Sequence, residues 1–139
     1  MIKVGVRMPS DVDDAGDYLA NARALEAAGA GLITLDGEAP DRWVLLGAIA
    51  AVTERVQLLA DGSEPESLRA LSRGRLVADS GESWVEVDVP ADRASWVAML
   101  EDQESAGATG VIIPWDPRLI DLLRNPDPDD RSDLLIATG

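Results

Sequence analysis

The sequence predicts an α/β protein built on a parallel sheet, arranged either as a barrel or as a doubly wound sheet. Short apolar segments that suit buried strands alternate with longer segments of helical periodicity. One helix-to-strand pattern occurs twice along the chain. The length of 139 residues is that of one domain with one core, so we expect a single domain over residues 1–139.

The first half of the chain is predicted to alternate strictly between strands and helices. Three runs rich in Val, Ile and Leu are the expected strands: Ile2–Met8, Leu32–Leu35 and Val56–Leu59. Two segments with apolar residues at helical spacing lie between them: Asp13–Ala28 and Arg42–Glu54. Gly29 is a natural residue for ending the first helix. Three polar residues are candidates for its N-cap: Ser10, Asp11 and Asp13.

The second half is less regular. A short helix is expected over Glu64–Ser72, and two strands follow, Arg75–Ala78 and Trp84–Val89, which could pair as a hairpin. A helix from Asp92 to about Gly107, a buried strand and a last helix complete the predicted elements. The buried strand is Val111–Ile113, and the last helix is Pro117–Arg124.

The end of the chain has a different composition. Residues 125–133 contain two prolines and four aspartates, which is typical of an acidic, solvated loop. The apolar segment Leu134–Ile136 follows it. We expect this segment either to add a short strand or to dock on the body of the protein or on another subunit.

The pattern that occurs twice is EAAGAGLITLD at Glu26–Asp36 and ESAGATGVIIPWD at Glu104–Asp116. Each copy contains the end of a helix, an Ala-Gly-Ala turn, a buried strand and an aspartate after the strand. Repeated units of this kind build parallel barrels and doubly wound sheets. We therefore predict that the two copies have the same architecture.

Composition excludes several classes of function. The formal charge of −14 disfavours nucleic acid and anionic membrane surfaces. Because the chain has no cysteine and no histidine, it has no disulfides, thiolate nucleophiles, zinc sites with nitrogen or sulfur ligands, or Ser-His-Asp triad. Lys3 is the only lysine, and no P-loop or G-x-G-x-x-G motif is present. The sequence shows neither a signal peptide nor a membrane helix, which predicts a cytoplasmic protein.

Two blocks of the sequence resemble the luciferase-like flavin- or F420-dependent monooxygenases and reductases. The first block is ARALEAAGAGLITLD at Ala22–Asp36, followed by WVLLGAIAAVTERVQL at Trp43–Leu58, whose A-x-x-T-x-R-[VI]-x-L ending is characteristic of that family. The second block is LSRGR at Leu71–Arg75, which is similar to the family's L-S-x-G-R turn before the fourth strand. Together the blocks cover roughly half of the chain.

The resemblance implies a (β/α)8 barrel. A full barrel takes at least about 200 residues, so this chain is expected to be an abridged, TIM-barrel-like protein with about six mainly parallel strands. An incomplete parallel sheet leaves an open edge, and a homodimer would cover it. The resemblance also implies a small-molecule cofactor, FMN or F420, and oxidoreductase or monooxygenase activity. The alternative is a non-catalytic, dimeric protein that holds a flavin or serves as a structural or interaction subunit.

Functional residues of parallel barrels gather at the carboxyl ends of the strands. The residues expected to bind the cofactor there are Arg7, Asp36, Asp79 and Trp115, with Glu38, Asp61, Glu82 and Asp116 nearby. Asp36 matches the Asp of an Asp-His pair in F420-dependent relatives, although Gly37 replaces the His. No catalytic residue and no metal ligand is assigned, and carboxylate-based Mg²⁺ or hydrolytic chemistry is a third, weaker reading.

Several of these residues also have structural interpretations. Asp36 and Asp116 could each cap the helix that follows. An arginine of the LSRGR turn, Arg73 or Arg75, could pair with a carboxylate and lock a loop. Trp43 and Trp96 are expected in the core, whereas Trp84 and Trp115 could either pack or stack on a planar ring.

Overall fold

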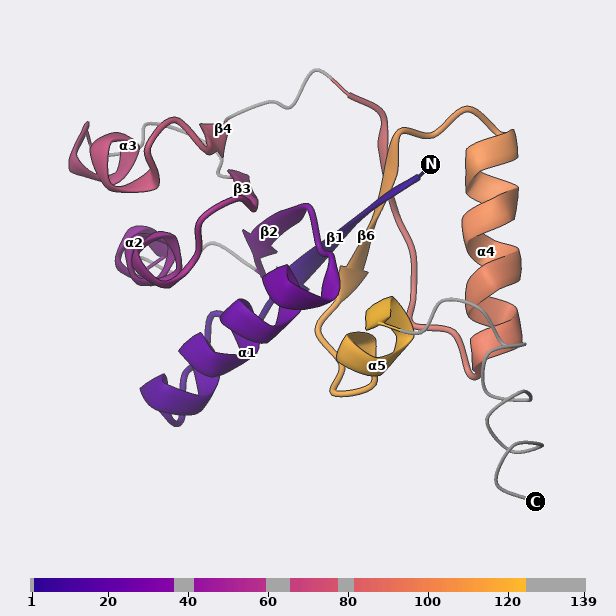
Figure 1. Ribbon diagram of the computed structural model, residues 1–139, viewed down its shortest axis with the longest axis horizontal. Helices are drawn as coiled ribbons and strands as arrows, with labels where there is room; N and C mark the ends of the chain where they lie inside the picture. The colour runs from indigo at the N-terminus through magenta and orange to yellow at the C-terminus, as the bar shows by residue number, and fades with distance from the viewer. Residues whose placement is uncertain (1, 37–41, 60–65, 78–81, 125–139) are drawn as a thin grey trace.

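The computed structural model describes residues 2–36, 42–59, 66–77 and 82–124. Within these ranges, six strands form one sheet and five helices pack beside it (Figure 1). The strands are β1 (Lys3–Met8), β2 (Leu32–Leu35), β3 (Gln57–Leu59), β4 (Leu76–Val77), β5 (Trp84–Glu86) and β6 (Gly110–Pro114). The helices are α1 (Ala15–Ala28), α2 (Arg42–Val52), α3 (Glu66–Ser72), α4 (Arg93–Ser105) and α5 (Leu119–Arg124).

The sheet is wound in a single direction. Its strand order is β4-β3-β2-β1-β6-β5, and every neighbouring pair is parallel, as the prediction of about six mainly parallel strands required. The steps from β1 to β4 and from β5 to β6 all run the same way across the sheet, so right-handed crossovers place their helices on one face. Figure 1 shows α3, α2, α1, α5 and α4 following one another in an arc. A doubly wound sheet would instead carry helices on both faces.

The strands β4 and β5 lie at opposite edges of the sheet, so a hairpin between them is wrong. Only residues 78–83 separate the two strands, and a link of that length reaches at most about 24 Å. A flat sheet would already hold the edges about 24 Å apart. Because the link also has to return from the carboxyl end of β4 to the amino end of β5, the sheet must curl and bring its edges toward each other.

Alternating side chains divide the sheet into two faces. Val4, Val6 and Met8 of β1 are buried in the core cluster together with the helices. The same face of the neighbouring strands contributes Ile33, Leu58, Val111 and Ile113. The opposite face, here called the inner face, carries Gly5, Arg7, Leu32, Thr34, Trp84, Glu86, Gly110 and Ile112.

The two copies of the repeated pattern build β2 and β6, the strands on either side of β1. In both copies a glycine with a left-handed backbone follows the helix: Gly29, with φ of 114°, is the C-cap of α1, and Gly107, with φ of 93°, comes directly after Ala106, the C-cap of α4. The N–H groups of these glycines donate to the carbonyl oxygens of Glu26 and Glu104, at 3.1 Å in each case. The predicted common architecture of the two copies is confirmed.

Helix α1 begins at Ala15, two residues after the predicted start at Asp13. Asp14 is the N-cap, and its Oδ1 accepts the backbone N–H of Asp17 at 2.9 Å. None of the three predicted candidates, Ser10, Asp11 and Asp13, occupies this position. The spacing of the N-cap relative to the first helical turn selects Asp14, since the cap oxygen has to reach the N–H of N2 or N3.

Candidate functional site

The carboxyl ends of the parallel strands meet at one edge of the sheet, as the sequence analysis assumed. There the backbone N–H of Asp36 donates to the carbonyl oxygen of Met8 at 2.8 Å, and that of Trp115 donates to the carbonyl oxygen of Arg7 at 2.9 Å. Three of the four predicted cofactor-binding residues, Arg7, Asp36 and Trp115, therefore lie on adjacent chain segments at this edge. The fourth, Asp79, lies outside the described residues, as do Glu38 and Asp61.

Arg7 projects from the inner face at this edge and forms an ion pair with Glu86. The two residues belong to β1 and β5, so their side chains meet across β6, the strand between them. The Arg7 side chain is 24% exposed and that of Glu86 is 65% exposed. Such an exposed pair is worth little in free energy, and another anion could take the place of Glu86.

Glu86 was missed by the sequence analysis. The alternation of Trp84, Val85, Glu86 and Val87 places Glu86 on the same face as Trp84. That alternation was visible in the sequence, but the pairing with Arg7 depends on β5 lying next to β6. The prediction also grouped Glu82 with the carboxyl ends, which is wrong. Glu82 precedes β5 at its amino end, where its Oε1 accepts a hydrogen bond from Lys3 Nζ at 2.9 Å.

Asp36 is exposed, and its backbone is held on both sides. Its N–H is bonded to Met8, and its carbonyl oxygen accepts the hydroxyl hydrogen of Ser10. The alternative interpretation, in which Asp36 caps the next helix, involves residues 37–41, which lie outside the described residues. What the structure establishes is a fixed backbone position for an exposed carboxylate beside the carboxyl end of β1.

Trp115 is half-buried and packs against the core cluster. Its alternation with Pro114 places it on the helix side of the sheet, opposite the side chain of Arg7. The indole therefore packs between the sheet and the helices, and the structure favours the packing interpretation of Trp115 over stacking on a planar ring.

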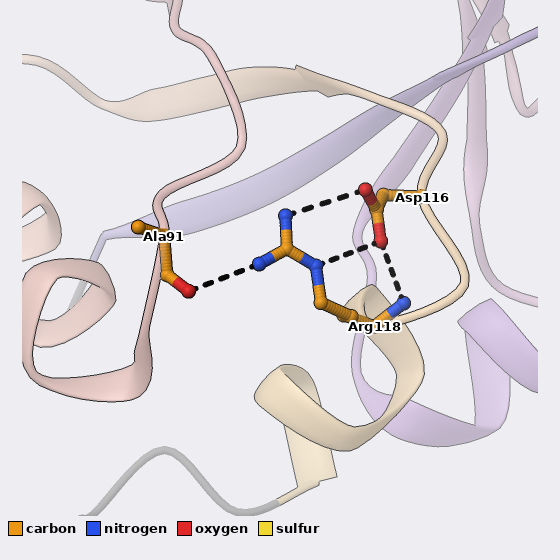
Figure 2. Close-up of polar contacts among 3 residues, drawn as sticks. All are labelled: Ala91, Asp116 and Arg118. Atoms are coloured by element: carbon orange, nitrogen blue, oxygen red, sulfur yellow. Dashed lines mark hydrogen bonds and ion pairs between the residues drawn. The ribbon is translucent and has the colours of Figure 1, made fainter.

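Asp116 lies three residues before α5, where its side chain closes the turn that leads into the helix, and it belongs to a small polar cluster (Figure 2). Its Oδ1 accepts the backbone N–H of Arg118 at 2.8 Å and the Arg118 Nε at 3.1 Å. Arg118 Nη1 also donates to the carbonyl oxygen of Ala91 at 3.1 Å, which ties the start of α5 to the segment before α4. The side-chain and backbone hydrogen bonds from Arg118 lower the pKa of Asp116. Asp116 therefore caps the turn at Pro117–Arg118, as its place before Pro117 predicts, while the helix itself begins at Leu119.

Trp84 fills the amino end of the inner face. A Cβ added to Gly110 would lie 2.5 Å from Trp84 Cζ3, and one added to Gly5 would lie 3.2 Å from the same atom. The indole thus lies over two glycines on adjacent strands, next to Leu32, which is fully buried. Its Nε1 is buried, and no described residue forms a hydrogen bond with it. Trp84 is half-buried, and it packs over these two glycines at the amino end of the inner face.

The residues that carry the family resemblance meet at the opposite end, around Arg75. This guanidinium donates from Nη1 to Thr53 Oγ1 at 2.9 Å, from Nη2 to the carbonyl oxygen of Ala50 at 2.8 Å, and from Nε to that of Ser72 at 2.8 Å. Nη1 also lies 3.3 Å from the carbonyl oxygen of Val56. The LSRGR turn is thereby fastened to the A-x-x-T-x-R-[VI]-x-L segment. Arg75 locks the turn as predicted, but the described residues that accept its hydrogen bonds offer carbonyl and hydroxyl oxygens in place of the predicted carboxylate.

Glu26 adds the third motif segment to this amino-end cluster. Its carboxylate accepts the backbone N–H groups of Glu54 at 3.0 Å, Arg55 at 2.7 Å and Val56 at 2.8 Å. Partial burial by itself would raise the pKa of Glu26, but these donors and the charge of Arg55 hold it below its usual value. The motif residues thus stabilise the amino ends of β2, β3 and β4. In parallel (β/α) folds, residues at this end of the strands serve stability, and those at the carboxyl end serve function.

In the ranges that the structure describes, no three acidic side chains are placed to hold a metal ion. Within those ranges there is also no helix of the length and apolarity needed to cross a bilayer. No family model, curated protein or solved structure matches this chain.

Proposed function

We propose that this chain is a cytoplasmic, luciferase-like domain protein with an abridged (β/α) barrel, and that it binds FMN or F420 as an oxidoreductase. Two features of the fold support the barrel: the single direction of winding and the curl required by the short link between β4 and β5. Three segments that carry the resemblance meet around Arg75 and Glu26. This supports the family, because the motif residues then share one structural role, which is to bond these segments to one another.

One observation carries the cofactor proposal: Arg7 lies on the inner face at the carboxyl end of β1, with an exposed carboxylate as its partner. FMN and F420 both bear phosphate, and a guanidinium binds phosphate through paired hydrogen bonds. Arg7 would release Glu86 and bind the phosphate in its place. Asp36, whose exposed carboxylate follows β2 at the same edge, would lie beside the ring. The bound cofactor supplies the hydride chemistry, while the protein supplies its position.

Paired titrations with FMN and riboflavin test this assignment, because only FMN carries the phosphate. Glu86→Gln should tighten FMN binding several-fold by releasing Arg7, and should leave riboflavin binding unchanged. Arg7→Met should weaken FMN binding by about tenfold or more. Glu82→Gln is the matched control, since it makes the same charge change at the amino end of β5. Failure of wild type and of Glu86→Gln to bind FMN or F420 at millimolar concentration would overturn the proposal.

The second candidate is a non-catalytic protein that acts as a homodimer. The observation that favours it is an exposed apolar surface on α2 and α3, including Val44 at 72% and Leu71 at 55% exposure. Exposed apolar surfaces of this kind commonly bind another protein. A colourless dimer that binds no flavin would support this candidate over the oxidoreductase.

A further inference from the structure

A pocket with a mainly apolar lining lies between α4 and α5. Its volume is about 440 Å³. The apolar side chains that line it include Val4 of β1, Trp96, Val97 and Leu100 of α4, and Leu122 and Leu123 of α5. Lys3 and Gly31 also line the pocket, and they lie at the amino ends of β1 and β2. The pocket is therefore at the amino end of the sheet; we call it the α4–α5 pocket.

The pocket leaves apolar side chains of both helices only partly covered. Helix α4 has 13 residues, and Trp96 is its one buried residue. Val97 and Leu100 of α4 and Leu123 of α5 are half-buried, and all three line the pocket. Helix α5 packs against α1, whereas α4 packs against β6. An apolar segment that fills the space between α4 and α5 would therefore remove the remaining apolar surface of these side chains from water.

We propose that the α4–α5 pocket is the docking site of the apolar segment Leu134–Ile136 of the same chain. Leu122 and Leu123 line the pocket directly before α5 ends at Arg124, so the chain continues from the border of the pocket. Residues 125–133 connect α5 to the segment, and residues 125–139 lie outside the described residues. A link of this length reaches at most about 33 Å, which is enough to return to a pocket that borders its own starting point.

Charge and covalent connection favour this segment over another chain. Residues 125–133 contain four aspartates, whereas Leu134–Ile136 is uncharged. Because Glu101 and Glu104 border the pocket, the uncharged segment suits it better than the acidic residues before it. A second copy carries a formal charge of −14 and would approach against repulsion. The short covalent link instead keeps the segment near the pocket at an effective concentration on the order of millimolar.

The position of the pocket separates this docking from the candidate cofactor site. The pocket lies at the amino end of the sheet, whereas Arg7 and Glu86 form their ion pair at the carboxyl end. In the arc of helices, α1 separates α5 from α2 and α3 (Figure 1). Docking of the segment would therefore stabilise α4 and α5 without covering Arg7, and it does not depend on flavin binding.

Paramagnetic relaxation enhancement in the full chain tests the docking. Because the chain has no cysteine, Ala137→Cys provides a single attachment point for a nitroxide label, directly after the apolar segment. The label should broaden the amide signals of residues 29–31 and 97–101, which border the pocket. The signals of residues 66–72 in α3 should keep their intensity.

Two variants of the labelled chain show whether the apolar side chains hold the segment in place. Leu135→Asp should abolish the selective broadening, because docking would then bury an unpaired carboxylate. Ser132→Asp is the matched control, since it adds the same charge three residues earlier, outside the apolar segment. It should retain the broadening. The amide spectrum itself reports whether each variant is folded.

Several results would overturn the proposal. Broadening that is absent, uniform, or unchanged by Leu135→Asp would show that the apolar segment does not occupy the pocket. Selective broadening at residues 76–77 or 84–86 would show that the segment adds a strand at an edge of the sheet. In a mixture of nitroxide-labelled chains with isotope-labelled chains that carry no nitroxide, no selective broadening is expected. Broadening of the pocket signals in that mixture would show that the segment docks on another copy.

Discussion

At the amino ends of β2, β3 and β4, Arg75 and Glu26 together bind backbone groups of several chain segments. At the carboxyl ends, Arg7 pairs with the exposed carboxylate of Glu86, whereas Arg118 pairs with Asp116 and also donates to the carbonyl oxygen of Ala91. The amino-end cluster satisfies partly buried backbone groups, so its removal leaves those groups unpaired. The Arg7–Glu86 pair at the carboxyl end can exchange Glu86 for a ligand at small cost. We infer that the amino end stabilises the fold and the carboxyl end is available for binding.

The largest expected difference between the two ends is in the free energy of unfolding after loss of an arginine. Arg75→Met should lower it by about 3 kcal/mol, because the carbonyl oxygens of Ala50 and Ser72 and the Thr53 hydroxyl lose their donor. Arg7→Met should lower it by less than about 1 kcal/mol. Urea unfolding of both variants measures this difference. If both variants lose the same free energy of unfolding, the two ends of the sheet do not differ in their contribution to stability, and the account is contradicted.

A second test concerns packing at the amino end of the inner face. Gly110→Ala would place a Cβ 2.5 Å from Trp84 Cζ3 and 2.9 Å from the carbonyl oxygen of Lys3, so the backbone or the indole has to move. We expect a loss of about 2 kcal/mol. Gly31→Ala is the control, since its nearest neighbour would be 4.0 Å away, at the carbonyl oxygen of Val4. A Gly110→Ala variant as stable as wild type would show that Trp84 is not held against this glycine.

Glu26 predicts a smaller, pH-dependent effect. The pKa of this carboxyl is lower in the folded chain than in the unfolded chain. Its stabilising contribution is therefore complete above the unfolded pKa and is lost as the pH falls through the folded pKa. Glu26→Gln should cost about 1 kcal/mol near neutral pH and nothing at acidic pH below both values. Urea midpoints of wild type and variant from pH 7 downward should converge; a constant difference would contradict the assignment.

The smallest expected effect on stability at neutral pH comes from ionisation of Tyr18, which lies beside the segment after the carboxyl end of β1. Burial raises the pKa of Tyr18 to about 12, and its hydroxyl donates to the carbonyl oxygen of Pro9 at 2.7 Å. The stability it contributes is complete below the unfolded pKa and is lost as the pH rises toward about 12. Since Tyr18 is the only tyrosine, ultraviolet titration of the folded protein observes it directly. Titration near 10 would show that the segment after β1 is open to water.

The sequence was sufficient to predict the parallel sheet, its strands and the repeated turns at Gly29 and Gly107, because these depend on local periodicity and on backbone conformations that favour glycine. It also predicted the core position of Trp96 and the cap at Asp116. These features are set by residues close together in the chain.

Features that depend on strand order could not be predicted in the same way. The period-two pattern from Trp84 suggested a hairpin, but the same pattern suits a parallel edge strand with one side facing the core. The ion pair of Arg7 with Glu86 and the packing of Trp84 over Gly110 both require β5 to lie beside β6. The sequence blocks that resemble the luciferase-like family do not inform on the carboxyl end, because Arg75, Thr53 and Glu26 all act at the amino end.

Hydrogen exchange of backbone amides with and without FMN tests the division between the two ends most directly. If the carboxyl end binds the cofactor, FMN should slow exchange at residues 7–10, 35–36 and 115–116, where backbone hydrogen bonds join β1 to its neighbours. Exchange at residues 53–56, beside Glu26 and Arg75, should not change. Slowed exchange confined to residues 53–56, or no change anywhere at millimolar FMN, would contradict the account.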